Sequence, residues 1–176
     1  MKKDEIVLKR PVSAMKESAL AYRKAHFACG EKTIYGSELF DQIESYDEWL
    51  KEVTRNTKPE TVDPNWVVTD TFFAIRPDDQ EIVGIIDLRH SLNDFLKDLG
   101  HCGYSVRPSE RRKGYGTQML RQLLDVAKEA DLQKLQLSVE RDNTASVRVI
   151  QNNGGVYERS FSFEGKEADV YGFLLK

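Results

Sequence analysis

The chain has little cysteine, no long apolar run and almost no excess charge. Its two cysteines, Cys29 and Cys102, are too few and too far apart to predict a disulfide framework or a cysteine metal site. We therefore expect reduced thiols and a cytoplasmic protein. The three histidines, His26, His90 and His101, also lack the spacing of metal ligands, so we expect no metal.

Membrane and nucleic-acid partners are also not expected from the composition. No segment comes near the roughly 20 apolar residues that span a bilayer, and residues 1–5 lead into no apolar core or cleavage site of a signal peptide. The net charge of −3 is too small to predict a nucleic-acid partner. With 176 residues, 40% of them hydrophobic, and no repeat or linker, the chain suits one domain over residues 1–176.

Hydrophobic periodicity predicts both strands and helices. We expect strands at 6–9, 66–75, 81–88, 100–106, 134–140, 156–163 and 168–175. We expect helices at 13–28, with Ser13 as N-cap, and at 37–55, 117–130 and 143–152, and a short helix or structured loop at 91–99. This order predicts an α/β fold with a mixed, mostly antiparallel central sheet flanked by helices.

The most informative segment is 111–116, which reads RRKGYG and leads directly into the helix predicted from residue 117. Glycine lets backbone N–H groups approach a ligand closely, and the free N–H groups of a helix start attract anions. The segment therefore predicts a phosphate site, although a solvated charge run would look similar. A P-loop pattern is absent, and Met119 stands where a dinucleotide fingerprint needs its third glycine.

This loop resembles the R/Q-x-x-G-x-G/A signature of the GNAT acetyltransferases, with Arg111, Gly114 and Gly116 at its defining positions. Val106 and Pro108 match the family's V-x-P lead-in, and the resemblance extends over residues 67–175. It implies a GNAT-like acyl-CoA N-acyltransferase fold with acetyl-coenzyme A as co-substrate. By resemblance, the pyrophosphate is held by Arg111, Arg112, Lys113, Gly114, Tyr115, Gly116 and Thr117.

Two further parts of the cofactor site follow from the same resemblance. Asn143 and Ser146 match a downstream family pattern and are expected to meet the pantetheine and phosphate region, although Asn143 is also a good helix N-cap. In the family, backbone groups of the strand that ends here at Val106 pair with pantetheine, and one N–H polarises the thioester carbonyl. We assign this role to Val106 and Tyr104.

The catalytic acid and base are not predicted. Family members often carry a Tyr four residues before a Gly-Phe pair, and Ile150 stands at that position here. Tyr104 and Tyr157 are conceivable substitutes, but tyrosines on strands usually serve packing. The possible bases, each of them better explained by itself as a surface or capping charge, are Asp87, His90, His101, Glu110 and Glu140.

The resemblance implies an N-acetyltransferase whose amine acceptor attacks the thioester directly in a ternary complex. The Asn-x-x-Ser pattern and the missing Tyr resemble the branch that acetylates N-termini of ribosomal proteins. A small-molecule amine such as a polyamine, an aminoglycoside or an amino acid is equally open, as is a protein lysine. The acidic segment 37–63 suits a cationic acceptor or a solvated helix face. The alternatives are a non-catalytic acyl-CoA sensor and a nucleotide-binding protein. The sequence does not specify the oligomeric state, for which a homodimer is the commonest assembly among proteins in general.

Overall fold

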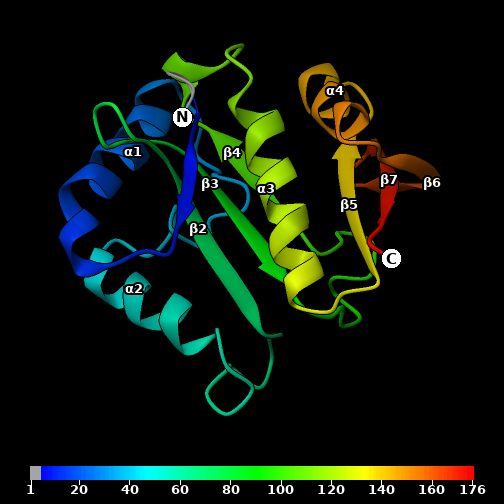
Figure 1. Cartoon of the computed structure of the whole chain (residues 1–176), viewed down its shortest axis with the longest axis horizontal. Coiled ribbons are helices and arrows are strands. Elements are labelled where there is room, and N and C mark those ends of the chain that lie inside the picture. Colours follow the sequence, from blue (N-terminus) through cyan, green and yellow to red (C-terminus); the bar gives the residue numbers. More distant parts are fainter. Residues whose placement is uncertain (1–4) are drawn as a thin grey trace.

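The computed structural model describes residues 5–176, which form two antiparallel sheets with helices packed on them (Figure 1). One sheet has the strand order β1 (Val7–Lys9), β2 (Thr69–Arg76), β3 (Glu81–Arg89), β4 (Tyr104–Val106). The other has the order β5 (Lys134–Glu140), β7 (Lys166–Leu174), β6 (Val156–Phe163). The helices are α1 (Lys16–Ala28), α2 (Tyr46–Arg55), α3 (Tyr115–Glu129) and α4 (Thr144–Asn152), with 3-10 turns η1 (Ser13–Met15) and η2 (Pro108–Glu110). The predicted α/β class is confirmed.

Residues 1–4, which carry part of the expectation of no signal peptide, lie outside the described residues. Among the helices of residues 5–176, none has both the length and the apolar character needed to cross a bilayer.

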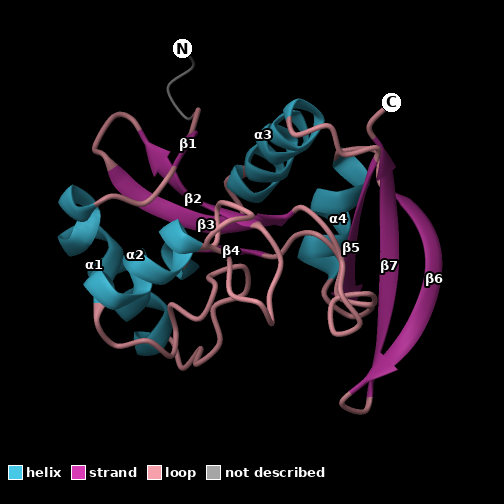
Figure 2. Cartoon of the chain, turned by 90° about the horizontal axis from the view of Figure 1, so that it is seen from below, coloured by secondary structure: helices cyan, strands magenta, loops and turns pink. Residues whose placement is uncertain are grey.

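Helices cover both faces of the first sheet. Figure 2 shows α1 and α2 on one side of β1–β4 and α3 on the other. The α1–α2 side buries an aromatic cluster that includes Tyr22, Trp49 and Phe73. Met119, Leu120 and other apolar residues of α3 are buried against β3 and the second sheet. Because each such side chain contributes roughly 1.5–3 kcal/mol on burial, the first core holds α1 and α2 on one face of the sheet and the second holds α3 on the other.

The two sheets meet at one end of β4 and separate along it. The His101 N–H donates to the Gln136 carbonyl at 2.7 Å, and Gly100 forms an isolated bridge with Leu137. Within residues 5–176, β4 itself is paired with β3 alone, and β5 is paired with β7. One edge of β4 therefore has no partner strand in the described part of the chain.

The helix predicted at 37–55 is shorter than expected. Residues 37–45 form turns, with Glu38 and Leu39 at φ +49° and +68°, and α2 begins only at Tyr46. Such values are incompatible with a right-handed helix. The Ser45 hydroxyl accepts from the Glu48 N–H at 3.2 Å and caps α2. The apolar spacing around Phe40 fits a helix by chance, because this side chain is buried by tertiary contacts.

Other predicted boundaries also move. Residues 91–99 form turns, which is the structured loop of the two alternatives expected there. β4 is confined to 104–106, and just before it the Gly103 N–H donates to the Asp87 carboxylate instead of to the backbone of β3. Ser13 lies in η1 and does not cap α1, whose N-cap, Met15, has no side-chain hydrogen bond. β2 begins three residues later than predicted, at Thr69, and α3 begins two residues earlier, at Tyr115.

Candidate functional site

The loop before α3 presents a row of free backbone donors. Arg112 and Gly114 have φ +65° and +85°, with Lys113 between them outside the left-handed region. None of the six N–H groups of residues 112–117 donates to an acceptor within residues 5–176. Alternating left-handed residues and a helix N-terminus are both typical of anion sites. The predicted phosphate loop therefore has the local geometry of an anion site.

Tyr115 and Gly116 are buried, so a ligand on the loop would meet the backbone N–H of each rather than a side chain. A Cβ at Gly116 would lie 3.2 Å from Cγ2 of Val149, 3.7 Å from Cε2 of Tyr104 and 3.8 Å from Cγ2 of Val106. Gly116 thus lets the first turn of α3 pack closely against β4 and α4. Gly114, by contrast, has open space around its Cβ direction and needs glycine for its positive φ.

Arg111 is held by an acidic partner that sequence reasoning missed. Its guanidinium makes two bonds to the Glu31 carboxylate, at 2.7 and 2.8 Å, and its Nε donates to the Val106 carbonyl at 3.1 Å. The Arg111 hydrogen bonds, opposed by burial, lower the pKa of Glu31 to about 2. Glu31 also contacts Nδ1 of the buried His26 at 2.8 Å. Arg111 therefore ties the loop to β4 and to the end of α1.

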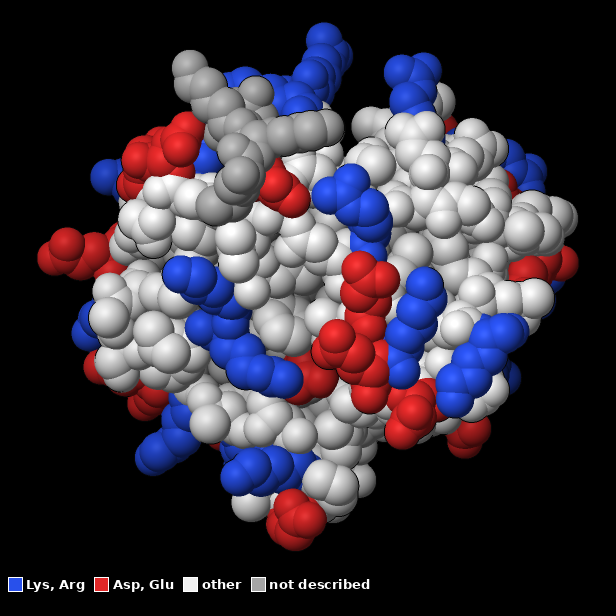
Figure 3. Space-filling view, viewed as in Figure 1, with Lys and Arg blue, Asp and Glu red and all other residues white. Residues whose placement is uncertain are grey.

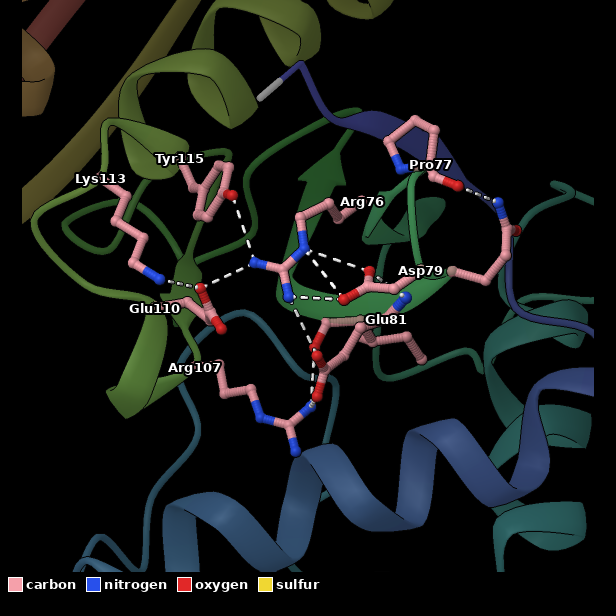
Figure 4. A network of polar contacts seen from close by, with 10 residues as sticks. Arg76, Pro77, Asp79, Glu81, Arg107, Glu110, Lys113 and Tyr115 are labelled. Carbon is pink, nitrogen blue, oxygen red and sulfur yellow. Dashed lines mark hydrogen bonds and ion pairs between the residues drawn. The ribbon is translucent and has the colours of Figure 1, made fainter. Parts of the chain in front are cut away.

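A second ion cluster anchors the loop from the other side (Figure 4). Arg76, at the end of β2, bonds to Glu110 at 2.9 Å and to the Tyr115 hydroxyl at 3.3 Å. Glu110 also accepts from Lys113 at 2.7 Å, and the pKa of its carboxyl is lowered by Lys113 and by Arg76. Among the three loop cations, Arg112 alone has no ion pair within residues 5–176.

The free edge of β4 carries backbone groups that point away from β3. The Asp87 N–H bonds to the Gly103 carbonyl, and the Arg107 N–H bonds to the Val83 carbonyl. Because alternate residues of an antiparallel strand bond to the same neighbour, the N–H groups of Tyr104 and Val106 face the free edge. This direction suits the backbone role assigned to them from the sequence.

Asn143 caps a helix, which is one of the two roles expected for it from the sequence. Its Oδ1 accepts from the Ser146 N–H at 3.2 Å and caps α4. Ser146 lies against the Tyr104 hydroxyl, which is buried without a well-formed hydrogen bond in the described chain. Burial raises the pKa of Tyr104 to about 12. The structure thus brings Ser146 and Tyr104 together, while their contact with a cofactor stays a prediction.

Four of the five possible bases are engaged away from the free edge of β4. His90 contacts Asp70 at 2.7 Å. The ring of His101 accepts from the Gln136 N–H at 2.9 Å, and burial lowers its pKa. Glu110 belongs to the Arg76 cluster, and Glu140 pairs with Lys166 at 3.3 Å.

Asp87 is the fifth candidate and is fully buried. Its Oδ1 accepts from the Gly103 N–H at 2.6 Å, immediately before β4. Ile150, at the position of the family's Tyr, is buried in the core, and Tyr157 contacts Ser160 on the outer strand β6. Neither the position of Ile150 nor Tyr157 therefore supplies an acid beside β4.

The molecular surface carries no dominant charge on the side shown in Figure 3, where acidic and basic side chains are interspersed. Within residues 5–176, no group of three or more His, Cys, Asp or Glu side chains is placed to hold a metal ion.

Comparison with known proteins relates the chain to acetyltransferases. The model of the Acetyltransferase (GNAT) family matches residues 37–154. No curated protein is significantly similar in sequence. The solved ribosomal-protein-S5-alanine acetyltransferase of Vibrio fischeri is 15% identical, with a TM-score of 0.77, over 99% of this chain and 95% of that one. A spermidine N-acetyltransferase chimera from Vibrio cholerae and hSSAT is 15% identical, with a TM-score of 0.66, over 97% and 95%. The putative acetyltransferase yncA of Salmonella typhimurium, solved with acetyl-CoA, is 14% identical, with a TM-score of 0.69, over 98% and 95%.

Proposed function

The chain belongs to the GNAT acetyltransferase family, and on this premise we propose that it transfers the acetyl group of acetyl-coenzyme A to an amine. The acceptor attacks the thioester carbonyl directly while both substrates are bound. A C–N bond forms, the C–S bond breaks, and the proton that the amine loses is taken up by solvent or by the leaving coenzyme A thiolate. The observation that carries the proposal is the row of six N–H groups at residues 112–117, which has no acceptor in the described chain.

This row fits the diphosphate of the donor for a physical reason. A helix start leaves its first N–H groups free and favours negative charge, and here the loop before α3 adds further N–H groups that lack an acceptor in the described chain. The Arg111–Glu31 pair and the Arg76 cluster hold the loop in this shape before any ligand arrives. Binding therefore requires little ordering of the loop, which favours affinity.

The free edge of β4 supports the placement of the thioester arm. The N–H groups of Tyr104 and Val106 would pair with the amide groups of pantetheine, as an added strand would. The Val106 carbonyl also accepts from Arg111, which holds this part of the edge in place. An N–H aimed at the thioester oxygen would stabilise the negative charge that develops there during attack.

The acceptor is an amine of a protein or of a small molecule. Neighbours with this fold are named for acting on ribosomal proteins and on spermidine, so the fold accommodates both classes. The neighbour crystallised with acetyl-CoA supports the choice of donor.

A charge placed beside the proposed cradle tests the donor site. Gly114 and Gly165 share a positive φ and open space at the Cβ position, and Gly165 lies in the β6–β7 hairpin. Gly114→Glu and Gly165→Glu thus carry the same strain and the same added charge. At about 8 Å and an effective dielectric of about 20, one added charge opposes each phosphate charge by about 2 kcal/mol. We expect acetyl-CoA affinity, measured calorimetrically, to fall at least about 30-fold in Gly114→Glu and to change little in Gly165→Glu.

Acetyl transfer itself is measured as release of the coenzyme A thiol with a panel of amines, in a Cys29→Ser background because the Cys29 thiol is exposed. Release with any amine supports the enzyme. Tight donor binding without release from any amine would instead favour the acyl-CoA sensor, and displacement of the donor by ATP would favour a nucleotide-binding protein. Equal donor affinity in Gly114→Glu and wild type would refute the cradle.

A further inference from the structure

One face of the first sheet changes from apolar to polar towards the end of β3. Ile85 and Phe73 are buried side by side in the α1–α2 core. The next pairs on the same face are Asp87 opposite Thr71 and Arg89 opposite Thr69, and all four are buried. Apolar packing therefore stops where a buried ion pair begins, with Arg89 Nε 3.4 Å from Asp87 Oδ2. A polar group at this depth is costly unless it is paired.

Glu38 adds a second carboxyl to this ion pair from the loop 37–45. Its carboxyl hydrogen-bonds to the Asp87 carboxyl, and its Oε1 accepts from Nε1 of Trp66 at 2.8 Å. Two carboxyls thus face one guanidinium, that of Arg89. A hydrogen bond between two carboxyl groups requires a proton on one of them, and with that proton the three groups are neutral together. Burial, followed by Asp87, raises the pKa of Glu38 well above its ordinary value.

Glu38 also lines a pocket of about 540 Å³ formed by the segment 33–43, the end of α2, Trp66 and Phe95. The Ser37 hydroxyl borders the same pocket and is buried without a partner in the described chain. The exposed side chains of Tyr35, Leu39 and Phe95, each more than half accessible, lie around it.

The other carboxyls of the pocket already have partners. Asp41 accepts from the Ile34 N–H at 2.7 Å, and Glu52 and Asp63 both pair with Arg55. Two further titratable groups lie near this site: the Cys102 thiol, which is buried beside Asp87 and Arg89, and the His101 ring, which is close enough to Arg89 to interact with its charge.

The pocket adjoins β4 on the face opposite α3. The Ser105 hydroxyl donates to the Tyr35 carbonyl at 2.8 Å. Gly36 lies so close to Gly103 that an added Cβ would meet the Gly103 carbonyl oxygen at 2.2 Å. A molecule in the pocket is thus next to the strand that carries the free N–H groups.

We propose that Glu38, which lines the pocket and has Asp87 behind it, binds the ammonium group of the acceptor, and that the proton shared by the two carboxyls passes to solvent when this cation arrives. The inference rests on the proposed acetyl transfer and adds the site that selects its acceptor. After proton release, two carboxylates face Arg89 and the ammonium, so the buried charges again balance. A neutral molecule of the same shape does not cause the two carboxyls to release their proton. It also brings no charged group to the Ser37 hydroxyl, which borders the pocket.

The Trp66 indole N–H reports on this site without acetyl-CoA. The chain has two tryptophans, and Trp49 donates to the carbonyls of Ser37 and Glu38 instead of to a carboxylate. In ¹⁵N-labelled protein, with Trp66→Phe to assign the signals, we expect the Trp66 resonance to follow a carboxyl that titrates above the ordinary glutamate range. Butylamine should move the midpoint down by at least one pH unit, whereas butanol should not. By linkage, butylamine affinity then rises at least tenfold as the site loses its proton.

Glu38→Gln tests the same site by substitution, because glutamine can still accept from Trp66 and donate to Asp87. Its Trp66 signal should not titrate, and butylamine affinity should fall at least tenfold. Asp41→Asn, which removes a partnered carboxyl of the same pocket, should behave as wild type. With active enzyme, Glu38→Gln should raise the KM for the amine at least tenfold.

A wild-type midpoint that butylamine leaves unchanged over the whole concentration range would overturn the proposal, and so would equal butylamine affinity in wild type and Glu38→Gln. Neither readout uses the donor. Failure here therefore leaves acetyl transfer intact, and an inactive enzyme would not affect the titration.

Discussion

Replacing Glu31 by glutamine removes the carboxylate that holds Arg111, and we expect the folded state to lose about 1–2 kcal/mol at pH 7. Lowering the pKa of a carboxyl from 4.5 to about 2 corresponds to about 3 kcal/mol of folding free energy. The side chains of Glu31 and Arg111 are 33% and 44% exposed, so solvent screens the pair and reduces that contribution. The magnitude is still large for one ion pair because the contact is bidentate.

The pH dependence identifies the source of this free energy. The folded state lowers the pKa of Glu31, so the contribution is complete above about pH 4.5 and is lost as the pH falls towards 2. The difference between wild type and Glu31→Gln in the free energy of unfolding, measured by urea denaturation at several pH values, should shrink to less than half by about pH 3.

Glu60→Gln is the matched control, because Glu60 is exposed and has no ion pair within residues 5–176. It makes the same change in charge and should alter the free energy of unfolding by less than about 0.5 kcal/mol. If Glu31→Gln were as stable as wild type at pH 7, or if its deficit did not change with pH, the Arg111–Glu31 pair would not anchor the phosphate loop.

Alanine substitutions at Gly36 and Gly116 test the packing around these two residues, and the same substitution at Gly30 is a control. Gly36→Ala should cost about 3 kcal/mol or more in thermal or urea unfolding, since it adds a Cβ 2.2 Å from the Gly103 carbonyl oxygen at φ +74°; Gly30→Ala, at φ +81° with nothing within 4 Å, should cost only about 1–2 kcal/mol. Gly116→Ala should cost about 1 kcal/mol through its 3.2 Å contact with Val149. A double-mutant cycle with Val149→Ala should recover that loss, and strict additivity would contradict the contact.

Local sequence patterns correctly predicted the elements whose formation depends on residues within the element itself. The helix expected at 117–130 is observed as α3, and the strands expected at 134–140 and 156–163 have the predicted bounds. Asn143 caps α4, one of its two predicted roles. In each case the spacing of apolar residues or the chemistry of one cap acts within a few residues.

The segment 37–45 could not be predicted in this way. Phe40 follows a helical spacing, but it is buried by its packing against Trp49 and Phe73, which come from α2 and β2. The positive φ values of Glu38 and Leu39 are set by the same packing, since Trp49 Nε1 also bonds to the carbonyls of Ser37 and Glu38. Tertiary contacts overrode the local preference.

The sequence by itself determined the geometry of the loop 111–117, the predicted phosphate site, because the glycines, the cations and the start of α3 are neighbours along the chain. Only the tertiary structure decided what surrounds that loop. Glu31 and Arg111 are 80 positions apart, and Glu38 and Asp87 are 49 apart, yet each pair is in contact. The physical reason is that a charge acquires its partner and its degree of burial from the packing of distant segments, which no local spacing specifies.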